Sequence, residues 1–127
     1  MFSHIMIGSN DIERSKKFYD AIFAAMGASP CIQDDKGRLI YVHNGGRFLI
    51  TPPINGEPAT HANGGTIGFA MDSPEQAEAW HQAGVTHGGT AIENPPGLRE
   101  TSFGGLYLAY LRDPDGNKLC ALHRMPK

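Results

Sequence analysis

The chain of 127 residues carries 11 basic and 13 acidic side chains, for a net charge of −2, and 40% of its residues are hydrophobic. This length and composition predict one globular domain with its own core, and the lack of a basic cluster gives little support to nucleic-acid binding. No apolar run approaches the roughly 20 residues of a membrane-spanning helix, no signal peptide is evident, and two cysteines are too few for a disulfide framework, so we expect a cytoplasmic protein with reduced thiols.

The first half of the chain predicts a β-α-β-β-β unit. Alternating side chains predict a strand over residues 2–8. Asn10 is a good N-cap for a helix, Glu13 follows at the capping-box spacing, and Gly27 is placed to end that helix. Apolar side chains recur at three- and four-residue steps between these ends. Turn-forming stretches then separate three expected short strands, at residues 28–33, 39–43 and 48–51.

The second half repeats this pattern after a polar, Gly- and Pro-rich stretch. A strand is expected at residues 66–71, followed by a helix that Ser73 caps and Pro74 begins. A short strand at 91–93 and a long loop at 94–105 lead to a hairpin at 106–124, whose turn is Asp113-Pro114-Asp115-Gly116. The sequence therefore predicts one α+β domain with two β-α-β-β-β modules, at about 1–51 and 65–127, and a linker at about 52–64.

Three stretches carry a resemblance to a known family: SHIMIGSNDIERSKKFYDAIF, TIGFAMDSPEQAEAWHQAG and RDPDGNKLCALHR. In their order and spacing they resemble the vicinal oxygen chelate superfamily, the glyoxalase / bleomycin-resistance / extradiol-dioxygenase group. The resemblance implies that the two modules form a curved, cup-shaped mixed sheet with the helices on the outside. It also implies a homodimer, because the cup of such proteins is commonly completed at a dimer interface.

The resemblance further implies where a divalent metal would bind. Metal-dependent members take one ligand from the first and one from the last strand of each module, usually histidine, glutamate, histidine and glutamate. Here His4 matches the first position, the strand at 47–51 offers only Thr51, and Thr66 and Cys120 occupy the third and fourth positions. His4 and Cys120 are therefore the candidate ligands for Zn, Fe, Ni or Mn, although a stable protein site normally needs at least three protein ligands.

Five residues are predicted to line the pocket of the cup: His4, Thr66, Arg99, Tyr107 and Cys120. Arg99 is suited to pair with a carboxylate or phosphate of a ligand. Tyr107 and Tyr110 fall on opposite faces of their strand, so one should face the cup and the other the helices. No residue is singled out as catalytic. Cys120 would need a lowered pKa to act as a nucleophile, and the alternative is a small buried structural side chain.

Three functions remain open at this point. The first is a protein that binds a small organic molecule in a largely apolar cup, without a cofactor and with the usual metal site largely lost. The second is a metal-dependent glyoxalase-like lyase or isomerase, or a dioxygenase, with a rearranged ligand set that includes His4 and Cys120. The third is a non-catalytic protein that sequesters a drug, like the bleomycin-resistance members. In each case the expected partners are a small molecule and a second copy of the chain, with no nucleic acid and no membrane.

Overall fold

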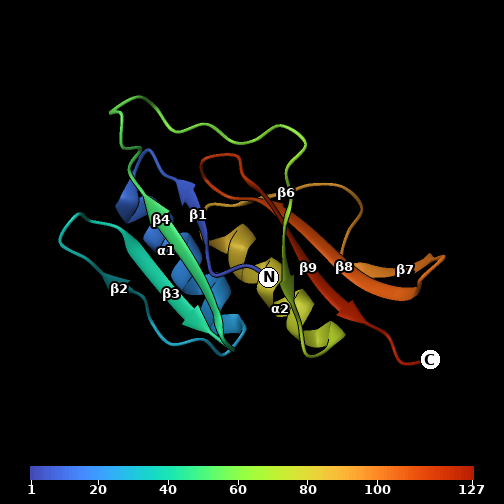
Figure 1. The fold of residues 1–127 in the computed structure, drawn as a ribbon. Coiled ribbons are helices and arrows are strands. Elements are labelled where there is room, and N and C mark those ends of the chain that lie inside the picture. Colours follow the sequence, from blue (N-terminus) through green and yellow to red (C-terminus); the bar gives the residue numbers. More distant parts are fainter.

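The computed structural model describes residues 1–127 and contains two helices and two mixed β-sheets (Figure 1). The first half of the chain forms a four-stranded sheet in the order β1-β4-β3-β2, in which β1 and β4 are parallel. Its elements are β1 (Ile5–Gly8), α1 (Ile12–Ala25), β2 (Ile32–Gln33), β3 (Leu39–His43) and β4 (Gly46–Thr51). The β2 strand is shorter than predicted, because only two residues pair with β3.

The second half forms a five-stranded sheet in the order β5-β9-β8-β6, and β7 also pairs with β8. Its elements are β5 (Ile67–Ala70), α2 (Pro74–Thr86), β6 (Thr90–Ala91), β7 (Gly97–Thr101), β8 (Gly104–Arg112) and β9 (Lys118–Arg124). The predicted α+β arrangement of two repeated units is confirmed. The prediction of a continuous loop at 94–105 is wrong, because five of these residues pair with β8 although their own sequence has little strand pattern.

The helix ends are set by local side-chain hydrogen bonds. Ser73 caps α2 as predicted, by accepting a hydrogen bond from the backbone N–H of Gln76 at 3.1 Å. The cap of α1 is Asp11 and not Asn10, since the Asp11 side chain accepts from the N–H of Arg14 at 3.1 Å. The Asn10 side chain instead fixes the linker, through reciprocal hydrogen bonds of 3.1 and 2.7 Å with the backbone of Ala59.

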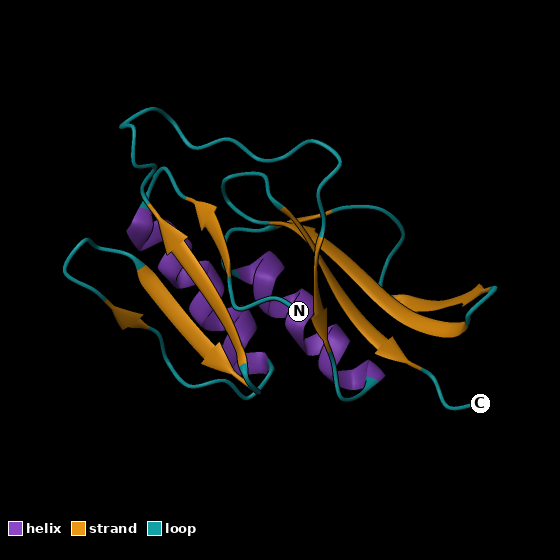
Figure 2. Ribbon diagram, in the orientation of Figure 1, coloured by secondary structure: helices purple, strands orange, loops and turns teal.

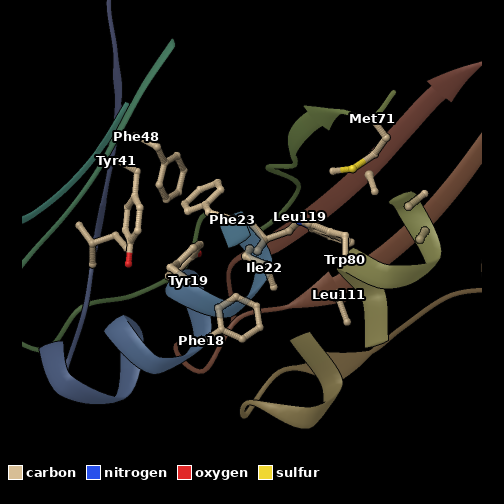
Figure 3. Close-up of a cluster of buried hydrophobic side chains, with 14 of the residues drawn as sticks. Phe18, Tyr19, Ile22, Phe23, Tyr41, Phe48, Met71, Trp80, Leu111 and Leu119 are labelled. Carbon is tan, nitrogen blue, oxygen red and sulfur yellow. The ribbon is translucent and has the colours of Figure 1, made fainter. Parts of the chain in front are cut away.

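The core lies between the helices and the two sheets (Figure 2). The helices pack against each other, and α2 also packs on β8 and β9. Phe18, Tyr19 and Ile22 on α1 are fully buried, as is Trp80 on α2 (Figure 3). This packing leaves β1 and β5 each at an unpaired edge of its sheet. Neither helix is long and apolar enough to cross a bilayer.

The turn between β8 and β9 is tied to α1 by buried hydrogen bonds. The Asp113 carboxylate accepts from the Tyr19 hydroxyl at 2.5 Å and from the Asn117 amide at 2.9 Å, and it also accepts two backbone N–H groups of the turn. Asp115 accepts from the Arg14 guanidinium at 2.8 Å. The Asp-Pro-Asp-Gly-Asn stretch therefore holds the second module on the first helix.

Candidate ligand-binding site

The second sheet has one face covered by α2 and one face that no helix covers. Alternate side chains of β8 point to opposite faces. The Tyr107 hydroxyl donates to Glu78 of α2 at 2.7 Å, which places Tyr107 on the helix side, and Tyr110 therefore lies on the uncovered side. We call the uncovered side the open face. It carries the alternate residues of four paired strands: Gly68 and Ala70 of β5; Gly97, Arg99 and Thr101 of β7; Leu106, Leu108, Tyr110 and Arg112 of β8; and Lys118, Cys120, Leu122 and Arg124 of β9.

The middle of the open face is apolar. Tyr110, Cys120 and Gly68 form one row across β8, β9 and β5, because Cys120 is the register partner of both neighbours. The next row consists of Leu108, Leu122 and Ala70. No atom lies within 4 Å of the position that a Cβ atom on Gly68 would take, so the space beside Cys120 is open.

Both ends of this apolar strip are cationic. At one end Arg99 and Arg124 flank Leu106, the register partner of both. At the other end Arg112 pairs with Lys118 in the register. The resulting surface suits a ligand with an apolar body and an anionic group.

The four cationic side chains of the open face differ in whether other groups of the chain already pair with them. Lys118 forms a salt bridge with Glu93, and its Nζ lies 4.9 Å from the centre of the Tyr110 ring. Arg99 donates to the carbonyl oxygens of Asn94 and Pro95, at 3.2 and 2.8 Å, and these two bonds fix the position of its guanidinium. Arg124 is exposed and takes part in no salt bridge of the chain. It is therefore the open-face cation most available to a ligand.

Cys120 lies at the centre of the open face, but its environment does not activate it. The residue is 6% exposed, and Sγ donates to the carbonyl oxygen of Ala121 at 3.5 Å. Burial raises the pKa of Cys120 above its usual value. Burial likewise raises the pKa of the neighbouring Tyr110. At neutral pH both groups are thus protonated, and Cys120 has the properties of a small buried side chain and not those of a nucleophile.

The raised pKa of Cys120 leads to a testable expectation. In a Cys31→Ser variant, which leaves Cys120 as the only thiol, alkylation by iodoacetamide at pH 7.5 should be at least about tenfold slower in the folded than in the urea-unfolded protein. The folded rate should continue to rise above pH 9. The protonated thiol also favours the folded state, so this contribution to stability should be lost as the pH rises from the unfolded pKa, about 8.5, through the higher folded pKa. An inflection of the alkylation rate below pH 7.5 would contradict this expectation.

The residues at the four expected metal positions do not fit the usual ligand set. His4 is exposed, and its Nδ1 lies 2.8 Å from the Ser3 hydroxyl. Thr51 donates its hydroxyl to the carbonyl oxygen of Pro52 at 2.9 Å, and Thr66 offers only a second hydroxyl. No group of three or more His, Cys, Asp or Glu side chains in the chain is placed to hold a metal ion. His4 and Cys120 are thus not joined by a third ligand, and the residues at these positions do not fit the metal site of metal-dependent members.

Two hollows of the chain are lined by none of the five predicted pocket residues. One, of about 270 Å³, lies between the modules and is lined by 13 residues of β1, β3, β4 and β5, of α1 and its C-cap Met26, and of the turn between β3 and β4. The other, of about 430 Å³, lies between the linker and β1. Sequence reasoning missed both, because each is formed by segments that only tertiary packing brings together. Arg124 was also missed, although its alternation with Cys120 along β9 could have identified it.

Comparisons with known proteins agree with this fold. Residues 1–121 match the family model described as Glyoxalase/Bleomycin resistance protein/Dioxygenase superfamily. A solved glyoxalase/bleomycin resistance protein from Albidiferax ferrireducens T118 is 59% identical, with a TM-score of 0.94, and the match covers 98% of this chain and 99% of that one. A search of curated proteins finds no match.

More distant structures share the fold alone. A glyoxalase/bleomycin resistance protein/dioxygenase family enzyme from Burkholderia phytofirmans PsJN is 18% identical, with a TM-score of 0.73 over 97% of this chain and 98% of that one. A lactoylglutathione lyase from Agrobacterium tumefaciens is also 18% identical, with a TM-score of 0.67 over 97% of this chain and 92% of that one. The family match over nearly the whole chain and the 59% identity together show that this protein belongs to the glyoxalase/bleomycin resistance/dioxygenase superfamily.

Proposed function

We propose that the protein binds a small organic anion on the open face of its second sheet, without the four-residue metal set of metal-dependent relatives. The observation that carries this proposal is the apolar strip between two cationic ends. The apolar part of a ligand would lie over Leu108, Tyr110, Cys120 and Leu122. Its carboxylate or phosphate would pair with Arg124, with Arg99 at the neighbouring position across Leu106.

A second copy of the chain would complete the cup. The face of the first sheet that points away from α1 exposes apolar side chains that nothing in one chain covers: Met6 is 41%, Val42 44% and Ile32 65% exposed. The unpaired edges of β1 and β5 also offer backbone groups for a partner strand. Proteins of this family often form dimers, and this supports the proposed arrangement. Sedimentation equilibrium that showed a monomer at concentrations where ligand binding saturates would contradict it.

A series of straight-chain carboxylates tests the proposed site. We expect affinity to increase from acetate to hexanoate by roughly fourfold for each added methylene, since each buried CH₂ contributes about 0.8 kcal/mol. Arg124→Gln should weaken hexanoate binding at least about tenfold, because it removes a charge-assisted hydrogen bond. Lys17→Gln removes an equal charge from an exposed position on α1 and should leave binding unchanged. Calorimetric titration measures all of these constants.

Hexanol and metal analysis provide the controls. Hexanol has the apolar chain without the charge, so Arg124→Gln should have little effect on its binding. Equal weakening of hexanol and hexanoate, or no dependence on chain length, would count against the open-face site. Protein purified without chelators should contain much less than one equivalent of Zn, Fe, Ni or Mn. A stoichiometric metal that is lost in His4→Ala would overturn the proposal that the protein lacks the metal set.

A further inference from the structure

The hollow of about 270 Å³ between the modules is a second candidate site, separate from the centre of the open face. Module one contributes most of its lining residues, and β5 of module two, Ile67–Ala70, closes the opposite side. Neither Cys120 nor any of the four open-face cations lines it. A ligand in this hollow would therefore not depend on the groups that we propose for the organic anion.

The hollow lies on the α1 side of the first sheet, beside Gly46. Directly paired residues of neighbouring antiparallel strands point to the same face. Tyr41 pairs with Phe48, and both rings contact Phe23 of α1. His43 pairs with Gly46 two residues further along the same face. A Cβ atom on Gly46 would meet only the His43 carbonyl oxygen, at 3.5 Å, so the glycine leaves room for a guest beside Phe48.

The inner wall of the hollow consists of three phenylalanines packed edge to face. Phe23 lies 5.6 Å from Phe48 and 5.3 Å from Phe69, and Phe48 lies 5.5 Å from Phe69, measured between ring centroids. Figure 3 shows Phe23 and Phe48 together on one side of the core, next to Tyr41. Aromatic rings prefer edge-to-face or offset contacts with further rings, so this wall favours a planar ring as guest.

The wall of the hollow carries no fixed charge. Arg47 is the only Lys, Arg, Asp or Glu among the lining residues, but it precedes Phe48 on β4 and pairs with Val42, so its side chain leaves the sheet on the opposite face. The Tyr41 hydroxyl donates to the Asp20 carboxylate at 2.6 Å, and burial together with this bond raises the pKa of Tyr41. An anionic group in the hollow would lose its hydration without gaining a counter-charge, which disfavours charged ligands.

His43 offers a hydrogen bond at the border of the hollow. Its Nε2 lies 3.1 Å from the side-chain amide nitrogen of Asn44. An amide nitrogen can only donate, so Nε2 is the acceptor and Nδ1 carries the proton of the neutral ring. No other hydrogen bond of the chain involves this ring. The Nδ1–H group is therefore available to the oxygen of a ligand.

We propose that the hollow binds a small neutral aromatic compound, with its ring against Phe23, Phe48 and Phe69 and a carbonyl substituent that accepts a hydrogen bond from His43. The volume is slightly below the range of about 300–1,000 Å³ that holds drug-sized ligands, so a single ring with one short substituent is the matching size. The site takes a neutral ligand because its wall has no charge to pair with an ion.

Benzamide, benzoate and toluene are the probes. We expect saturable benzamide binding at millimolar or lower concentration, with the largest shifts of the backbone amide signals of ¹⁵N-labelled protein at residues 46–48 and 67–70. Benzoate has nearly the same shape but a negative charge, and it should bind at these residues at least about tenfold more weakly. His43→Phe keeps a ring but removes the donor, so it should weaken benzamide about threefold to tenfold and toluene less than about twofold.

Two tryptophan substitutions in the same hairpin provide a blocking variant and its matched control. Gly46 is exposed, and a side chain there would project on the same face as Phe48, so Gly46→Trp should fold and abolish binding of benzamide and toluene. Val42 is 44% exposed and points to the opposite face, so Val42→Trp should leave binding unchanged. Arg124→Gln should also leave benzamide unchanged, which separates this test from that of the open face.

Several outcomes would overturn the proposal. These are no saturation with benzamide, equal affinity for benzoate at the same residues, an equal loss of benzamide and toluene in His43→Phe, and equal effects of Gly46→Trp and Val42→Trp. Benzamide affinity that falls as the protein concentration rises would mean that a second copy of the chain fills the hollow, and this would also overturn it.

Discussion

Replacing Asp113 by alanine is expected to destabilise the protein by about 3–5 kcal/mol. The carboxylate is buried and accepts four hydrogen bonds: one from the Tyr19 hydroxyl, one from the Asn117 amide, and two from backbone N–H groups of the turn. Removing it leaves these buried donors without an acceptor, and each unpaired group costs about 1–3 kcal/mol before water or rearrangement relieves it. Urea unfolding monitored by circular dichroism measures the change in the free energy of unfolding.

Two milder variants divide this effect between its parts. Tyr19→Phe removes only the hydroxyl that links α1 to the turn, and we expect a loss of about 1–2 kcal/mol. Asp113→Asn keeps one side-chain oxygen that can accept from the backbone N–H groups of the turn, but its new amide N–H₂ faces another hydrogen-bond donor. The loss of stability should therefore lie between those of Tyr19→Phe and Asp113→Ala. A loss below about 1 kcal/mol for Asp113→Ala would show that the turn does not need this acceptor.

Replacing Gly84 by valine is expected to cost about 3 kcal/mol or more through overpacking of the core. A Cβ atom at Gly84 would lie 2.3 Å from Leu111, 3.2 Å from Phe18 and 3.3 Å from Ile22. All three neighbours are fully buried and cannot move into solvent. The gain of about 1 kcal/mol or less from replacing a helical glycine does not offset this clash. The same urea titration measures the effect.

The same substitution at Gly68 is the matched control. Gly68 lies in the exposed edge strand β5, and nothing lies within 4 Å of its Cβ position. Valine favours strands, so Gly68→Val should be neutral or stabilising by up to about 1 kcal/mol. Similar destabilisation at both positions would mean that the cost at Gly84 arises from the backbone and not from the lack of space against α1 and β8.

The Asp113–Asn117 stretch has a structural role that its sequence does not reveal. From the sequence, Asp113-Pro114-Asp115-Gly116 predicts a turn, and the turn is present, with Gly116 at a φ of +93°. Only the structure shows that its carboxylates reach α1, about a hundred residues earlier in the chain. The segment that makes the family recognisable therefore also holds the second module on α1. This explains why the recognisable turn says little about substrate.

The sequence by itself determined the fold class, the positions of both helices, the Ser73 cap and the hairpin at 106–124, because these depend on local periodicity and turn chemistry. It also indicated that Cys120 shares a strand face with Lys118 and Leu122. Tertiary packing alone decided which tyrosine faces the helices, since alternation separates Tyr107 from Tyr110 but cannot tell which side α2 covers. It also decided the existence of β7, the grouping of Arg99 with Arg124, and the hollow of about 270 Å³ between the modules, because each depends on contacts between segments that are distant in the chain.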